Sequence, residues 1–207
     1  MALRDTTIDP RLIESARKIF RQKGFMAAQL SEICKDAKVT TGAVYKRYKG
    51  KEELFEAVVK DTIDTMNNIL VTSQETDPSK LSDKELVDTW TNSEENTMLW
   101  CKRLLEMRDG LEILLNCSEG TKYSRFHDEW LERMSDIDYA FLKELQDRGL
   151  ADKSVSRLEL HVMVSAMWQL YSEPVVHGMS DKDVKHHCKI AGKLFNWKEA
   201  LSIKAIK

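Results

Sequence analysis

Residues 30–48 read LSEICKDAKVTTGAVYKRY, and this stretch decides the fold of the N-terminal part of the chain. Its apolar spacing predicts one short helix over 30–37 and a second over 41–48, joined by about three residues. Two short helices joined by such a turn are typical of the helix-turn-helix motif, whose second helix enters the DNA major groove by its N-terminal end. The stretch therefore predicts a DNA-binding module.

The residue types of the second helix fit a surface that approaches DNA. Thr40 and the free amides that follow it can hold a phosphate oxygen, which the positive end of the helix dipole favours. Gly42 has no side chain and allows the backbone to come close, while Thr41 and Ala43 are short enough to touch base edges. One hydroxyl and three cations complete the surface and supply contacts to phosphates. These residues are Tyr45, Lys46, Arg47 and Lys51.

The rest of the chain is also predicted to be helical. It has 207 residues but only 8 glycines and 3 prolines, too few for a β-sandwich or barrel with many tight turns. Apolar residues recur at helical spacing between cap and stop signals. We expect an all-α fold of nine helices, over residues 10–23, 30–37, 41–48, 50–70, 82–105, 107–117, 122–148, 158–171 and 181–195.

The charge of the chain is divided unevenly. Residues 1–60 hold 13 lysines and arginines against 8 aspartates and glutamates, a net charge of +5, whereas residues 61–207 hold 19 against 26, a net charge of −7. A basic module for a polyanion joined to an acidic body accounts for this asymmetry. We expect a helix-turn-helix domain over 1–50 and a helical effector-binding and dimerisation domain over 51–207, with the helix over 50–70 linking them.

Other classes of protein are disfavoured by the composition. The longest stretch without a formal charge, residues 160–172, has 13 residues, short of the roughly 20 that span a bilayer. Residues 1–9 carry charges and precede no apolar run, so no secretory signal is expected and the predicted location is the cytoplasm. The cysteines at 34, 101, 117 and 188 form neither a zinc pattern nor a disulfide framework. Neighbouring helical residues at 186–188 point about 100° apart and disfavour a metal.

Residues 10–60 resemble the DNA-binding domain of the TetR family of bacterial transcriptional regulators. The positions that carry the resemblance hold their spacing without a gap from Gly24 to Leu54. They are Gly24-Phe25, Ile33-Cys34, Ala37-Lys38-Val39-Thr40, Gly42, Tyr45, Arg47-Tyr48 and Lys51 to Leu54. The resemblance implies a homodimeric repressor that binds a palindromic double-stranded DNA operator and is released by a small effector.

The resemblance also assigns roles to single residues. Thr41, Gly42, Ala43, Tyr45 and Lys46 would face DNA, and Thr40, Arg47 and Lys51 would lie near phosphates. The sequence departs from the family pattern at three places, which are Gln29 in place of a capping threonine, Lys38 in place of the glycine of the turn, and Arg47-Tyr48 in place of His-Phe. Gln29 is a poorer cap, and Lys38 must accept an unfavourable backbone conformation or use a different turn, from which it can add a cation.

The body of the chain is rich in large and pliable apolar side chains, which suit an apolar effector pocket as well as a plain core. All five tryptophans and seven of the nine methionines follow residue 61. His127 and His161 could hydrogen-bond the polar end of a ligand, although a histidine without a ligand role is the commoner case. The candidate pocket residues are Trp100, Cys101, Met107, Phe126, His127, Trp130, Met134, His161, Met163 and Met167.

The two last expected helices have surplus apolar surface, and the first of them is apolar almost all the way round. Two such helices are typical of half of a four-helix bundle completed by a second subunit. The candidate dimer interface consists of Leu160, Val164, Trp168, Tyr171, Val184, Cys188, Ala191 and Phe195.

Two alternatives to a ligand-responsive repressor stay open. A DNA-binding regulator could be controlled by a protein partner, and activation is possible as well as repression. A helical enzyme is less favoured, because the sequence has no glycine-rich phosphate loop, metal constellation or nucleophile motif. No cofactor is expected.

Overall fold

The computed structural model describes residues 8–206, and these fold into eleven α-helices and one 3-10 helix without a strand. The expectation of an all-α fold is confirmed, with more helices over the described residues than the nine expected. The described residues form two compact units. The first comprises residues 8–65 and 107–127, and the second comprises residues 66–106 and 128–206, so the division differs from the domain boundary expected at residue 50.

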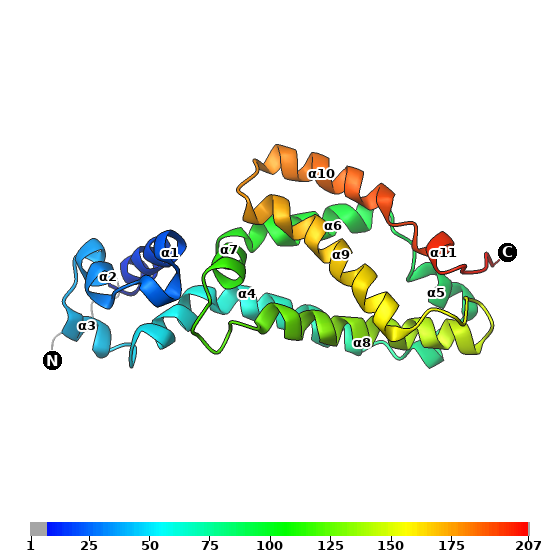
Figure 1. The fold of residues 1–207 in the computed structure, drawn as a ribbon, viewed down its shortest axis with the longest axis horizontal. Coiled ribbons are helices and arrows are strands. Elements are labelled where there is room, and N and C mark those ends of the chain that lie inside the picture. The colour runs from blue at the N-terminus through cyan, green and yellow to red at the C-terminus, as the bar shows by residue number, and fades with distance from the viewer. Residues whose placement is uncertain (1–7, 207) are drawn as a thin grey trace. The chain divides into compact units, whose positions relative to one another are not determined.

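The first unit contains α1 (Ile8–Ala27), α2 (Leu30–Ala37), α3 (Thr41–Tyr45), the first part of α4 (Lys51–Gln74) and α7 (Arg108–Asn116) (Figure 1). Three phenylalanine rings form the centre of its core. Phe20 lies 5.1 Å from Phe55 and 6.0 Å from Phe25, measured between ring centroids. Tyr123 stacks on Phe55 from the segment after α7. These rings join α1 and α4, while α2 packs on α1 and α3 packs on α2.

Helix α7 packs closely on α4 because Gly110 has no side chain. A Cβ atom at this position would lie 2.0 Å from the Thr62 hydroxyl oxygen. Arg21 of α1 adds ion pairs of 2.8 Å to Asp109 and 2.9 Å to Glu112. Helix α7 therefore belongs to the same packed unit as the N-terminal helices.

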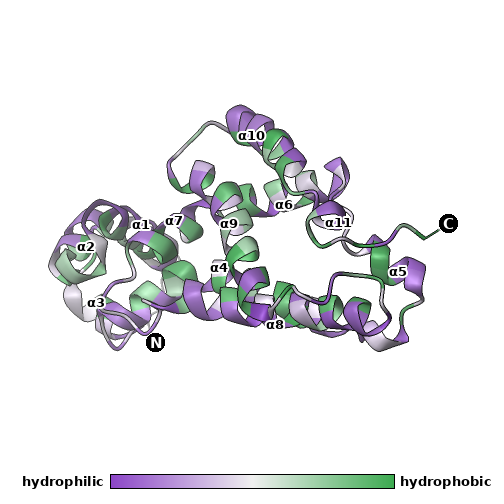
Figure 2. Ribbon diagram, turned by 45° about the vertical axis from the view of Figure 1, so that its right-hand side comes forward, coloured by the Kyte–Doolittle hydropathy of each residue, from purple (hydrophilic) through white to green (hydrophobic). Residues whose placement is uncertain are grey.

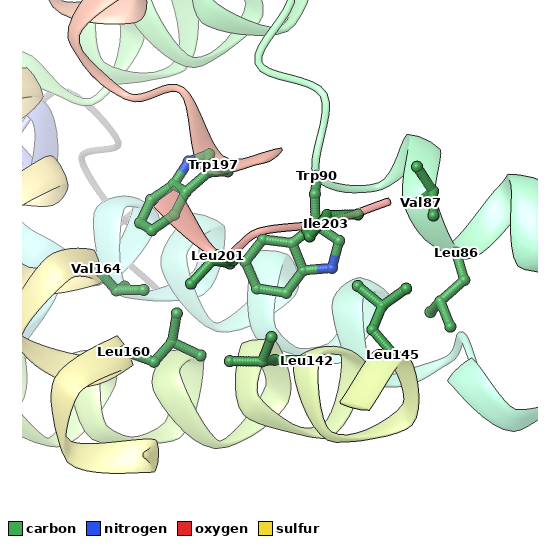
Figure 3. Close-up of a cluster of buried hydrophobic side chains, with 10 residues drawn as sticks. All are labelled: Leu86, Val87, Trp90, Leu142, Leu145, Leu160, Val164, Trp197, Leu201 and Ile203. Carbon is green, nitrogen blue, oxygen red and sulfur yellow. The ribbon is translucent and has the colours of Figure 1, made fainter. Parts of the chain in front are cut away.

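The second unit contains the remainder of α4, the 3-10 helix η1 (Pro78–Lys80), α5 (Asp83–Asp88), α6 (Glu94–Glu106), most of α8 (Phe126–Asp147), α9 (Arg157–Val176), α10 (Asp181–Leu194) and α11 (Trp197–Ala200). A cluster of buried side chains from α5, α8, α9, α11 and the segment after α11 fills one part of it (Figure 3). Trp90 and Trp197 meet edge to face there, with centroids 6.0 Å apart. In Figure 2, hydrophobic and hydrophilic residues alternate around α10, as expected for a helix with one buried face.

Local capping explains where several of these helices begin. Ser82 and Glu85 form a capping box at α5, and Ser156 and Glu159 form another at α9. The Ser180 hydroxyl accepts the Asp183 amide at 3.2 Å at the start of α10. The helix starts expected from the sequence at 82 and 181 therefore agree with the structure within one residue.

Other expected boundaries are corrected by the structure. The helix expected over 82–105 is two helices, and the Asn92 side chain between them donates to the Gly192 carbonyl at 2.8 Å. The helix expected over 41–48 ends at Tyr45, and residues 46–47 form a turn. Helix α8 begins at Phe126, four residues later than expected, because residues 121–125 form hydrogen-bonded turns.

The C-terminal ends of α1 and α9 also differ from those expected from the sequence. Helix α1 runs to Ala27, but Gly24 has a left-handed, non-helical conformation (φ 71°), so the helix changes direction at the glycine that was expected to end it. Helix α9 continues through Pro174 to Val176 instead of stopping at Tyr171. No helix in the described range is both long and apolar enough to cross a membrane.

Candidate functional site

The turn between α2 and α3 has the geometry of a helix-turn-helix. Lys38 ends α2 in the left-handed conformation (φ 56°, ψ 44°), so the lysine accepts the backbone geometry that a glycine would adopt more easily. The Thr40 hydroxyl caps α3 by accepting the Ala43 amide at 3.2 Å. At the start of α2, the backbone N–H of Gln29 donates to the Glu32 carboxylate at 3.4 Å. Both short helices are thus fixed at their N-terminal ends by hydrogen bonds between a side chain and a backbone amide three residues away.

Helix α3 is held by one side and exposed on the other. Val44 is fully buried among the first unit's core residues. Thr41, Gly42 and Lys46 are exposed, and 59% of the Tyr45 side chain is accessible. An exposed tyrosine on a short helix contributes little to the core, so its surface is available to a partner.

Gly42 is not required by the packing of the protein itself. A Cβ atom at this position would meet only the Thr40 hydroxyl oxygen, at 4.0 Å, among the described residues. Its φ is not left-handed, so backbone conformation gives no reason for glycine either. A glycine inside a helix costs about 0.5–1 kcal/mol relative to alanine. Neither packing nor backbone geometry within the chain explains this glycine, so we expect the explanation to lie in a partner molecule.

Two of the cations expected at phosphates have partners within the first unit. Arg47 forms an ion pair with Asp9 and donates to the Ala43 carbonyl at 3.1 Å, and its side chain is 10% exposed. The Lys51 ammonium donates to the Phe25 carbonyl at 2.7 Å and the Ala28 carbonyl at 2.9 Å. Both side chains hold the unit together in this structure, whereas Lys38 and Lys46 are exposed.

A cavity of about 400 Å³ lies within the second unit, lined by residues of α4, α6, α8, α9 and α11 and of the loops after α4 and α5. All five tryptophans of the chain line it. Trp130 and Trp168 lie with their centroids 5.0 Å apart, and the Trp130 indole donates to the Met66 carbonyl at 2.8 Å. The cavity is thus an aromatic-walled site of the size of a small ligand.

Four of the ten pocket residues expected from the sequence line this cavity, and these are Trp100, Trp130, Met134 and Met167. The other six do not line it. His161 bonds the Ser135 hydroxyl at 2.8 Å, and Met163 packs on the buried cluster of Figure 3. Cys101 is fully buried. The remaining three, Met107, Phe126 and His127, belong to the first unit.

Most of the lining residues were not expected from the sequence, and one of these carries a carboxyl group. Asp138 of α8 lines the cavity, and burial raises the pKa of its carboxyl from 3.8 to about 7. A signal for it exists in the sequence, because Asp138 follows Met134 by four residues and precedes Phe141 by three. It therefore lies on the apolar face of the helix, where a carboxyl is unusual.

The interface residues expected on the last two helices are corrected by their burial. Leu160, Val164, Trp168, Tyr171, Val184, Cys188 and Ala191 are all buried within the single chain, and Phe195 is half-buried against Trp197. A face already packed inside one chain cannot also meet a second one. The exposed apolar residues of α9 and α10 are a different set, comprising Leu158, Val162, Ile190 and Leu194.

The cysteines are buried and inert. All four are free thiols, and burial beside Cys101 raises the pKa of Cys188 to about 12. No group of three or more potential metal ligands is found within residues 8–206.

Comparison with known proteins finds relatives for the N-terminal part of the chain. Residues 12–58 match the family model described as "Bacterial regulatory proteins, tetR family". The HTH-type transcriptional regulator UidR of Escherichia coli (strain K12) is 35% identical over 49 residues, which are 24% of this chain and 25% of UidR. The negative transcriptional regulator IcaR of the biofilm operon icaADBC in Staphylococcus aureus (strain Newman) is 28% identical over 64 residues, 31% of this chain and 34% of IcaR. The chain thus matches about a quarter to a third of the length of these relatives.

Solved structures agree with this chain in fold over most of its length. A TetR-family regulator from Streptomyces coelicolor A3 superposes with a TM-score of 0.58 at 19% identity, over 88% of each chain. The regulator FadR from Bacillus subtilis, solved in complex with stearoyl-CoA, gives a TM-score of 0.52 at 18% identity, over 89% of this chain and 96% of FadR. The N-terminal segment is thus similar to the DNA-binding segment of TetR-family regulators, and the fold of the whole chain resembles that of solved structures of this family.

Proposed function

We propose that the protein is a transcriptional regulator that binds a double-stranded DNA operator through α3. The observation that carries the proposal is the exposed face of α3, with Thr41, Gly42, Tyr45 and Lys46 outward while Val44 anchors the helix in the core. A side chain such as Tyr45 reaches a base edge or phosphate in the major groove, and Lys46 adds a phosphate contact. Thr40, Ala43 and Lys38 flank this face.

The proposed active form is a homodimer. Helices α9 and α10 pack against each other within the second unit, and they carry Leu158, at 68% exposure, and Leu194, at 67%. With Val162 and Ile190 they form the apolar residues that a second copy would cover. Two recognition helices about 34–36 Å apart would then read successive major grooves of a palindromic site.

Repression released by a small effector is the proposed direction of control. The name of IcaR describes a negative regulator, and a matching structure from Pseudomonas aeruginosa, NalD, is described as the secondary repressor of an efflux pump. The cavity of the second unit supplies a site for the effector. An effector releases DNA only if it binds the DNA-free arrangement more tightly than the DNA-bound one.

The first test is DNA binding by variants of the exposed face. We expect the double substitution Tyr45→Ala with Lys46→Ala to weaken binding to the DNA upstream of the gene by at least about tenfold, since each contact is worth about 1–3 kcal/mol. Fluorescence anisotropy with labelled DNA measures the affinity. Lys84→Ala, an equally exposed lysine of α5 in the second unit, is the matched control. Equal affinities of the double variant and the control would overturn the proposal.

Gly42→Ala gives a second test, because folding and DNA binding should change in opposite directions. Open space around the Cβ position means that alanine should raise the free energy of unfolding by about 0.5–1 kcal/mol. If the α3 backbone comes close to DNA, the added methyl should weaken binding severalfold. Urea denaturation and anisotropy on the same preparation separate the two effects. A more stable variant with undiminished DNA affinity would show that DNA does not approach this part of α3.

A further inference from the structure

The cavity of the second unit combines aromatic walls with a single formal charge. Besides the five tryptophans, Phe141 and Tyr171 line it. Among the lining residues, all of which belong to the described part of the chain, Asp138 is the one with an ionisable carboxyl, and none is a lysine, arginine or histidine. The lining residues therefore favour a positively charged ligand over a negatively charged one.

Asp138 has no partner for its carboxyl. Within residues 8–206 no hydrogen bond or ion pair joins it to another group, whereas Asp136, two residues earlier on α8, is paired with Arg157 at 2.7 Å outside the cavity. A partly desolvated charged group without a partner costs free energy, and a ligand of opposite charge recovers part of it. The nearest comparable cation–aromatic contact in this unit is internal, with Arg103 5.6 Å from the Trp100 ring centroid, and Arg103 does not line the cavity.

The raised pKa of Asp138 is consistent with a carboxyl that has no charged partner. Desolvation is its cause, with no charged neighbour contributing, so the surroundings of the carboxyl stabilise its charge less than bulk water does. A cation bound beside the carboxyl would supply that stabilisation and favour the ionised form.

Indole rings attract cations through the negative charge of their faces, and they do so more strongly than phenyl rings. An aromatic enclosure with a carboxylate is the arrangement by which proteins bind alkylammonium groups, since the rings shed the water and the carboxylate balances the charge. An anionic ligand would instead place its charge near Asp138 with no cation in the wall to balance it.

We propose that the ligand of this cavity is a lipophilic organic cation, held by Asp138 and by the tryptophan faces around it. This inference depends on the proposed function in one respect only, namely that binding of the cation releases DNA. The binding itself depends on the second unit alone.

Benzyltrimethylammonium and neopentylbenzene form a suitable pair of probes, because they have the same shape and differ by the positive charge. Phenylacetate serves as the anionic probe. Quenching of tryptophan fluorescence reports binding, since every tryptophan lines the cavity. We expect the full-length protein to bind the cation at least about tenfold more tightly than either of the other probes, a difference of about 1.4 kcal/mol.

Asp138→Asn keeps the shape of the side chain and removes its charge. We expect it to weaken binding of the cation by at least about tenfold and to leave binding of neopentylbenzene within about twofold. Asp136→Asn, the same substitution on the same helix outside the cavity, is the control and should change neither. No binding of the cation, equal binding of cation and neutral probe, or full retention of cation binding by Asp138→Asn would each overturn the inference.

DNA binding is measured separately on the same proteins. If the cation binds through Asp138 but no DNA fragment is bound, the proposed function fails and the inference stands. If DNA is bound specifically but the cation is not, the inference fails and the proposed function stands.

Discussion

Replacing Asp138 with asparagine is expected to raise the free energy of unfolding above pH 7 by up to about 4 kcal/mol, a gain that shrinks toward zero near pH 4. Burial disfavours the charged carboxylate, so its pKa in the folded protein, about 7, exceeds the 3.8 of an exposed aspartate. Between these two pH values the folded protein keeps a proton that the unfolded chain has released. The stability that this proton provides is complete at low pH and is lost as the pH rises through 7, and asparagine removes that loss.

Urea denaturation of the parent protein and of Asp138→Asn, from about pH 4.5 to about pH 8.5, measures the difference. Asp136→Asn is the control, since it removes only an exposed ion pair with Arg157, worth at most about 1 kcal/mol. A stability difference between Asp138→Asn and the parent that stays constant across this pH range would contradict the prediction.

Phe55→Ala is expected to destabilise the first unit by about 3–5 kcal/mol, because it removes a fully buried ring and leaves a cavity. The ring meets Phe20 and Phe25 edge to face and stacks with Tyr123, so three aromatic contacts are lost together. Because α2 packs on α1, which supplies Phe20 and Phe25, and α3 packs on α2, DNA binding should fall as well.

Hydrogen exchange of the α2 and α3 amides, read by mass spectrometry, measures the loss locally. Phe55→Leu keeps most of the buried volume and should cost clearly less, about 1.5 kcal/mol. Exchange in Phe55→Ala as slow as in the parent protein would show that the aromatic cluster does not support the recognition helix.

The helix-turn-helix could be predicted from the sequence because its determinants are local. Thr40 caps α3 three residues away, and Val44 alternates with exposed neighbours on a single short helix. The break between α5 and α6 could not be predicted in the same way. Asn92 in this break donates to the carbonyl of Gly192, which lies 100 positions later in the chain, so the contact is not visible in the local sequence.

The cavity and the inward-facing side of α9 were predicted less well for a related reason. Helix α9 is apolar around most of its circumference, so the period of its sequence does not tell which side packs inward. Leu160 and Val164 pack inward and Val162 does not, which is a property of the neighbouring helices. Asp138 could have been recognised from its place on the apolar face of α8, but its lack of a partner is visible only in the folded chain.

Several basic side chains of the N-terminal helices are paired within the chain, which limits the number of cations that can contact DNA phosphates. Lys18, Lys23 and Arg47 are paired with carboxylates, and Lys51 is bonded to carbonyls. Beside α3 this leaves Lys38, Lys46 and Lys49 without an ion-pair partner within residues 8–206. Each phosphate neutralised by such a cation releases about 0.9 counterion, so log affinity should fall with log salt concentration with a slope of about −3 per chain. Operator binding should therefore be only moderately sensitive to salt, and base contacts should supply a large share of it.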